Sequence, residues 1–208
     1  MTDVYIEEGS RRVFACSVEW PGWCRAGKNE EAALEALTTS APRYGLIAKQ
    51  AGVPFDVRAA AAKFTVKERL AGSMTTDFGA PGSISEGDRK PLSKNDAERQ
   101  ATLLEASWKV FDRVVKKAPT TLRKGPWGGG RDRDQIAEHV TGAEDMYARK
   151  LGVRVKDAAE RRRAILEVIR GEGGPNKTAE RGWPARYAAR RIAWHAIDHT
   201  WEIEDRST

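Results

Sequence analysis

The sequence predicts an α+β protein: a small N-terminal unit of strands and helices, followed by an all-α bundle of four helices. Short segments rich in β-branched and aromatic residues end by residue 70. Beyond residue 94, apolar residues recur at helical spacing in long segments separated by glycine or proline. Residues 80–94 are rich in Gly, Pro and Ser and have little to bury. We therefore expect a small α/β domain at 1–79, a loosely packed linker at 80–94 and a helical domain at 95–208.

The elements of the N-terminal domain have local signals. Alternating segments predict three strands, at residues 3–7, 12–18 and 64–70. Asn29 is a suitable N-cap for an amphipathic helix, which we expect Pro42 to break. A second helix should then run as far as Gly52. The segment Trp20–Trp23 contains Pro-Gly and predicts a turn.

The C-terminal domain is predicted from helical periods and their stop signals. Four helices are expected, at about residues 95–117, 132–152, 156–170 and 183–205. Asp132 and Gln135 have the spacing of a capping box at the start of the second helix. A loop rich in Gly, Pro and Asn separates the third helix from the fourth. Helices of similar length joined by short breaks favour a four-helix bundle.

Composition and charge exclude several classes of protein. With 40% hydrophobic and 32% charged residues, the chain is neither disordered nor membrane-spanning. The N-terminus is acidic and unlike a signal peptide, which favours a cytoplasmic protein without a membrane partner. The net charge of +6 arises beyond residue 92, where basic residues alternate with acids and do not cluster with aromatics. This pattern argues against a nucleic-acid partner.

Two cysteines are present, Cys16 and Cys24, and they form no CxxC pair. In a cytoplasmic protein this pattern argues against a disulfide scaffold or a zinc ribbon. We expect both cysteines to be reduced and buried.

The three histidines of the chain are candidate ligands for one divalent metal ion. His195 and His199 are four residues apart on the last helix, which places both imidazoles on one face. His139 lies in the middle of the second helix, beside Gly142 and Ala143, small residues that would let the last helix approach. Three neutral imidazoles and an open position are typical of a catalytic zinc site. Ordinary half-buried histidines remain the alternative.

Charged residues of the last helix extend this hypothesis. Glu202 or Asp198 would orient an imidazole, and both are candidates for a catalytic carboxylate. Arg191, with Arg190 and Arg186, would hold the carboxylate of a small-molecule substrate at the mouth of the site. Exposed salt bridges are the alternative for these arginines.

Residues 95–208 resemble the DinB/YfiT-like superfamily of four-helix bundles. The similar segments are RDRDQIAEHVTGAEDMYARKLG and WPARYAARRIAWHAIDHTWEIEDRS. The resemblance implies that His139, His195 and His199 bind a divalent metal. The three-imidazole donor set favours zinc, with nickel or iron as alternatives. The resemblance also implies a transferase or isomerase that uses a low-molecular-weight thiol, or a related hydrolase. The Ala/Arg-rich composition favours a bacterial source and mycothiol as that thiol.

The N-terminal stretch FACSVEWPGWCRAGKNEEAALEALTT is similar to HicB-type antitoxin domains, over about residues 4–38. This similarity implies a shared small α/β fold rather than a toxin partner. Two functions therefore remain open. The first is a metal-dependent enzyme acting on a small molecule, and the second is a non-catalytic module whose N-terminal domain docks a protein. A homodimer is compatible with either.

Overall fold

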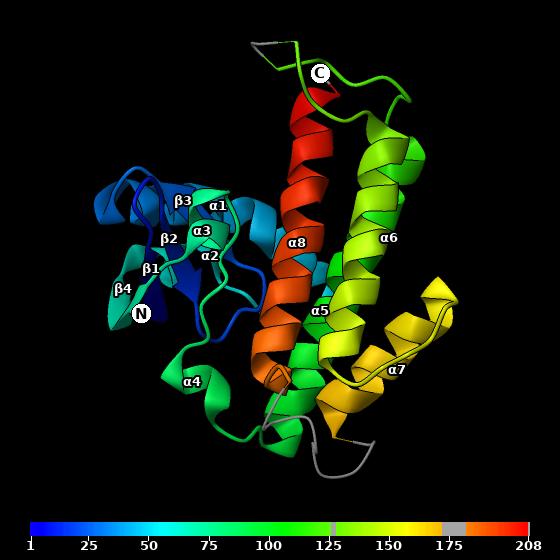
Figure 1. Cartoon of the computed structure of the whole chain (residues 1–208). Coiled ribbons are helices and arrows are strands. Elements are labelled where there is room, and N and C mark those ends of the chain that lie inside the picture. Colours follow the sequence, from blue (N-terminus) through cyan, green and yellow to red (C-terminus); the bar gives the residue numbers. More distant parts are fainter. Residues whose placement is uncertain (126–127, 172–181, 208) are drawn as a thin grey trace.

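A computed structural model describes residues 1–125, 128–171 and 182–207 (Figure 1). Its elements confirm a mixed α/β protein in which a four-stranded sheet lies at the N-terminus and helices follow. Most of the loop predicted between the third and fourth helices lies outside the described residues. Within the described part, no helix is both long enough and apolar enough to cross a membrane.

The N-terminal elements run as far as the linker. They are β1 (Thr2–Glu8), β2 (Val13–Ser17), β3 (Cys24–Gly27), α1 (Glu30–Ala51), α2 (Val57–Ala62), β4 (Phe64–Ala71), α3 (Met74–Asp77) and α4 (Glu86–Arg89). The long helices that follow are α5 (Lys94–Lys117), α6 (Arg133–Lys150), α7 (Ala158–Arg170) and α8 (Ala185–Arg206).

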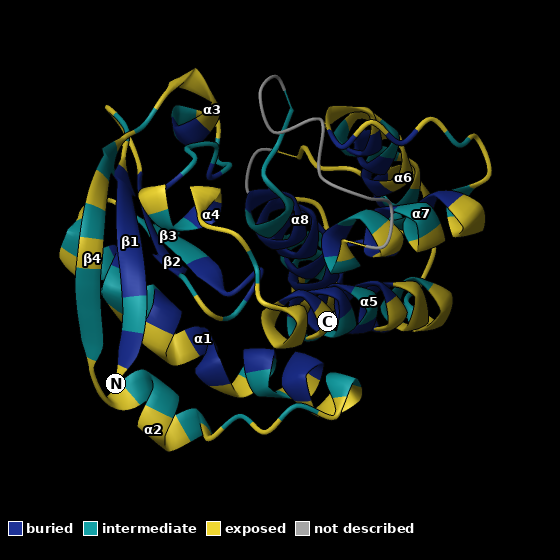
Figure 2. Ribbon diagram, turned by 90° about the horizontal axis from the view of Figure 1, so that it is seen from below, coloured by how far each residue is buried: buried dark blue, intermediate teal, exposed yellow. Residues whose placement is uncertain are grey.

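The sheet has the strand order β3-β2-β1-β4. Strand β1 pairs antiparallel with β2 and parallel with β4, and β2 pairs antiparallel with β3. Helix α1 packs against β2 and β3, so it covers one face of the sheet (Figure 2). The sequence did not predict β3, because this four-residue strand follows a turn directly and contains no alternating apolar pattern.

The predicted break at Pro42 is wrong, because α1 is continuous from Glu30 to Ala51. Proline removes one backbone hydrogen bond from a helix interior. Here Ala41 and Tyr44, on either side of Pro42, are fully buried against the sheet and α5. Their packing offsets the local cost. The predicted stop at Gly52 is confirmed, since Gly52 adopts a left-handed conformation with φ 67°.

Helices α5 to α8 pack around a common core. Its largest members include Leu104, Trp108, Phe111, Ile136, Ile165 and Ile192. Helix α8 packs against all three other long helices and also against α4. It is therefore buried over most of its length, which Figure 2 shows as dark blue. The predicted capping interaction is present at α6, where the backbone nitrogen of Asp132 donates to Gln135 Oε1 over 3.0 Å.

The N-terminal unit and the long helices share a second core. Ile6 and Tyr44 belong to the same buried cluster as Val110 of α5 and Trp201 of α8. The linker is not loosely packed either, because Asp88 of α4 is 3% exposed and forms an ion pair with Arg190 of α8. A short segment rich in Gly, Pro and Ser therefore buries a charged side chain, which composition does not reveal.

The prediction of reduced cysteines is contradicted, because Cys16 and Cys24 form a disulfide. The pairing of β2 with β3 places these two residues directly opposite each other. The bridge lies in a buried cluster with Phe14 and Trp194. Since β3 was not expected, the sequence offered no reason to bring the two sulfurs together.

Candidate metal centre

The three histidines converge between α6 and α8. Their potential ligand atoms all lie within 4.8 Å of one another. His195 and His199 occupy successive turns of α8, and His139 comes from the facing side of α6. We call this group the histidine cluster. The small residue that lies buried beside it is Ala143, whereas Gly142 is exposed and a Cβ atom there would touch nothing. The expected role of Gly142 is therefore wrong.

The geometry of the histidine cluster fits a divalent ion. His139 Nε2 and His195 Nε2 are 3.2 Å apart. Two nitrogens bound to one tetrahedral zinc at 2.0–2.1 Å would lie about 3.3 Å apart. The ring centroids are 4.7–5.0 Å apart, and the rings cross at 64° to 88°. Because they cross rather than stack, their nitrogens can point to one centre.

Glu202 holds His199 in this orientation. His199 Nδ1 lies 2.8 Å from Glu202 Oε2, and Arg206 Nη1 lies 2.6 Å from Glu202 Oε1. The hydrogen bond with His199 is the main cause that lowers the pKa of Glu202, with help from Arg206. A carboxylate on Nδ1 leaves Nε2 of the same ring to act as the ligand.

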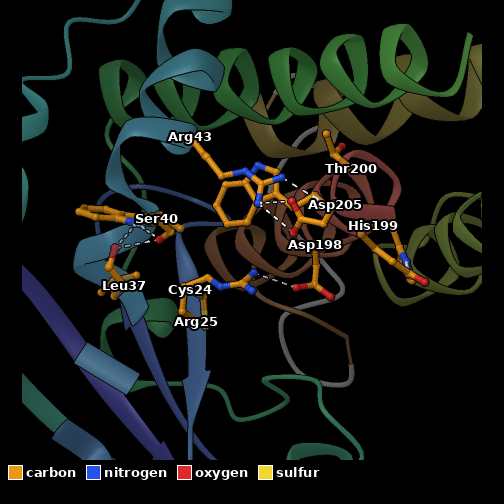
Figure 3. A network of polar contacts seen from close by, with 12 residues as sticks. Cys24, Arg25, Leu37, Ser40, Arg43, Asp198, His199, Thr200 and Asp205 are labelled. Carbon is orange, nitrogen blue, oxygen red and sulfur yellow. Dashed lines mark hydrogen bonds and ion pairs between the residues drawn. The ribbon is translucent and has the colours of Figure 1, made fainter. Parts of the chain in front are cut away.

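Asp198, the other candidate carboxylate, contacts an arginine of the N-terminal sheet instead of a histidine. Its Oδ1 accepts a hydrogen bond of 3.0 Å from Arg25 Nη1 of β3. Figure 3 shows Asp198 reaching toward Arg25, while His199 projects away from this network. The structure therefore places Glu202 beside the histidine cluster and Asp198 in the contact with the N-terminal sheet.

Burial and positive neighbours lower the pKa of two of the three imidazoles, those of His139 and His195. His195 is 6% exposed, and its burial, followed by the charges of His199 and Arg191, lowers its pKa to about 2. Burial is also the main cause that lowers the pKa of His139, with His199 and Arg131 adding to it. Neutral imidazoles are the form that binds a metal ion, so these two are ready to bind at neutral pH.

An open cavity of about 730 Å³ leads to the histidine cluster from the His139 side. It is lined by Gly130, Arg131, Gln135, Glu138, His139 and Glu202. The chain has no fourth histidine, and its two cysteines are bonded to each other. A coordination position facing the cavity would therefore remain available to a small molecule.

The three arginines predicted at the mouth of the site lie in different places. Arg190 is buried on the side of the sheet, paired with Asp88. Arg186 lies 4.0 Å from Asp96 of α5. Only Arg191 lies near the histidine cluster, and it is buried rather than at the mouth. The mouth contains Arg131 instead, which directly precedes the N-cap residue of α6.

Comparison with known proteins finds no relative of this chain. No family model matches the chain, and neither a curated protein nor a solved structure matches it.

Proposed function

We propose that this protein is a metal-dependent enzyme that joins a low-molecular-weight thiol to an electrophilic small molecule. The single observation that carries the proposal is the histidine cluster itself: three histidines, two of them buried enough to stay neutral, meet beside an open cavity. This donor set and the open position are those of catalytic rather than structural zinc sites. The resemblance of residues 95–208 to the DinB/YfiT-like superfamily supports the same assignment.

Each residue has a separate task in this proposal. His139, His195 and His199 would hold the ion, with zinc favoured by an all-imidazole set. When bound, the ion would lower the pKa of a thiol or a water molecule, so that a nucleophile is available at neutral pH. Glu202 orients His199 and lines the cavity, which makes it the better candidate for proton transfer than Asp198.

The proposed reaction requires two substrates. The thiol gives its S–H proton to a base, for which Glu202 is the candidate, a bond forms between its sulfur and the electrophilic carbon, and the bond from that carbon to the leaving group breaks. The leaving group departs with the electron pair. A cavity of about 730 Å³ has room for a small thiol and its partner.

The alternative of a non-catalytic docking module has less support. The N-terminal unit does not stand apart as a free binding surface, because Ile6, Tyr44 and Trp23 share a core with α5 and α8. One face of its sheet is covered by α1.

The test is metal analysis of the purified protein, followed by turnover of chlorodinitrobenzene with glutathione, bacillithiol and mycothiol. We expect one ion per chain and turnover with at least one thiol, both lost in His195→Ala. The control Glu138→Gln changes a residue that lines the cavity without a ligand role. Stoichiometric metal without turnover or hydrolysis would favour the non-catalytic module, and absence of metal would reject the proposal.

A further inference from the structure

Among the described residues, Arg191 is a buried cation without an anionic partner. It is 7% exposed, and its Nη1 atom has no hydrogen-bond partner in the described part of the chain. Arg190, by contrast, pairs with Asp88. Arg161 has only backbone carbonyls as acceptors, those of Val155 and Lys156 among them, and its Nε atom is also unsatisfied. A buried charge that is left unpaired is costly. Because no described residue supplies an acceptor for Nη1, the position is suited to an anionic ligand.

Two further donors beside Arg191 are also unsatisfied. The indole nitrogen of Trp194 and the Nδ1 atom of His195 are buried and have no partner among the described residues. Because Nε2 of His195 faces His139, Nδ1 carries the hydrogen when Nε2 serves as the ligand. All three groups then donate and none accepts. A ligand that satisfies them must supply acceptor oxygens, and the charge of Arg191 favours an anion.

Aromatic rings form the surroundings of this guanidinium. Its central carbon lies 4.7 Å from the ring centroid of Trp194 and 5.3 Å from that of Tyr147. Tyr147 in turn contacts Trp183, with 5.1 Å between ring centroids, and His195, at 5.7 Å. Tyr147 and Trp183 are only half-buried, so this group of rings reaches the surface. Flat walls of this kind suit a carboxylate attached to an unsaturated or aromatic body.

We propose that Arg191 binds the carboxylate of an aromatic or unsaturated acid, in a subsite between α6 and α8 formed with Tyr147 and Trp194. Arg191 lies four residues, about 6 Å along α8, from His195. A ligand held there would extend toward the histidine cluster. The inference deepens the proposed function, since it names a substrate class for the same site, and it rests on that function for its biological meaning.

The test is titration calorimetry of zinc-loaded protein with benzoate, and with benzamide as the uncharged analogue of the same shape. We expect benzoate to bind and benzamide to bind at least tenfold more weakly, because a hydrogen bond to a charged group contributes about 1.5–3 kcal/mol. Arg191→Met keeps most of the buried volume without the charge and should weaken benzoate binding at least tenfold. The conservative Arg191→Lys should restore part of that loss.

Arg131→Met is the matched control. Arg131 is an exposed cation whose charge also acts on His195, so a general electrostatic attraction would be lost equally in both variants. We expect Arg131→Met to change benzoate affinity by less than about threefold. An equal loss in the two variants, or a crystal structure with only water at Arg191 in saturating benzoate, would overturn the subsite.

A second comparison separates this inference from the proposed function. His139→Ala should lose the metal and keep benzoate binding, because His139 is not part of the subsite. If benzoate binding disappears with the metal, the carboxylate binds the ion and the inference fails. If the wild-type protein holds no metal but binds benzoate through Arg191, the proposed enzyme fails and the subsite stands. Thermal unfolding of every variant checks that the fold is intact.

Discussion

Arg25 of β3 is joined to Asp198 of α8 by an ion pair of 3.0 Å, one residue before His199. The N-terminal sheet thus contacts the helix that carries two members of the histidine cluster. The ring of Trp201 reinforces this junction, since the guanidinium carbons of Arg25 and Arg43 lie 5.0 and 4.9 Å from its centroid. The sheet therefore supports the position of α8 without contributing a candidate ligand.

Replacement of the two nearby carboxylates should separate their roles. Glu202→Gln should weaken metal binding about 10-fold to 100-fold, because Glu202 orients His199 through its Nδ1 atom. Asp198→Asn should leave metal affinity within about threefold and cost at most about 1 kcal/mol of stability, because its ion pair with Arg25 is partly exposed. Competition with a chelator of known affinity measures the first quantity, and urea unfolding the second. Equal losses of affinity would show that our division between the two carboxylates is wrong.

Removal of one imidazole should abolish stoichiometric metal binding and leave the helices folded. His195→Ala leaves only two imidazoles, while the core around Leu104, Ile136 and Ile192 does not include His195. Metal analysis after dialysis and far-ultraviolet circular dichroism check the two parts. Retention of one ion per chain in His195→Ala would place the metal elsewhere.

The metal-free protein should lose stability as the pH falls below the ordinary histidine pKa of about 6.5. Burial lowers the pKa of His195 to about 2 in the folded state, so below pH 6.5 the unfolded chain binds the proton and the folded chain does not. Stability is therefore fully present above pH 6.5 and declines toward the folded pKa, by roughly 2 kcal/mol between pH 8 and 5.

Urea unfolding with a chelator present, at pH 8, 6 and 5, measures this decline. His195→Gln is the reference, because it cannot take up the proton and should show a shallower pH dependence. Parallel curves for the two proteins would mean that His195 titrates normally in the folded state.

The sequence predicted most of the fold, because most elements carry local signals. Asn29 marks a helix start because its side chain accepts a hydrogen bond from the backbone nitrogen of Ala32, and Gly52 marks a helix end through its left-handed conformation; the structure confirms both. The elements that the sequence predicted wrongly, or did not predict, depend on tertiary contacts. Strand β3 forms because β2 offers it an edge, and α1 continues past Pro42 because Tyr44 is buried against other elements. Neither fact is present in a local pattern.

The candidate site was predictable where helix geometry alone determines it. The spacing of His195 and His199 requires a shared face, and a third histidine on a helix of similar length completes the group. The choice between Glu202 and Asp198 was not predictable, because it depends on Arg25 lying across from Asp198. The burial of Arg191 was missed for a similar reason, since charge alone suggested the surface.

The buried pair of Asp88 and Arg190 should be the most sensitive charged contact between the linker and α8. Asp88 and Arg190 are each 3% exposed, and Arg190 also contacts the hydroxyl of Tyr5. Asp88→Asn would leave the guanidinium buried without its counter-charge, and we expect a loss of about 3–5 kcal/mol in the free energy of unfolding. Asp96→Asn is the matched control, because Asp96 lies 4.0 Å from Arg186 and is largely exposed, so its loss should stay below about 0.5 kcal/mol.

The double variant Asp88→Asn with Arg190→Met completes this test. Removal of both charges should restore a large part of the stability, because most of the single-variant cost comes from the unpaired cation rather than from a net gain of the pair. Urea unfolding of the four proteins gives the coupling energy directly. A double variant as unstable as Asp88→Asn alone would mean that Asp88 acts through its hydrogen bond with the backbone of Ser85, and that Arg190 tolerates burial without it.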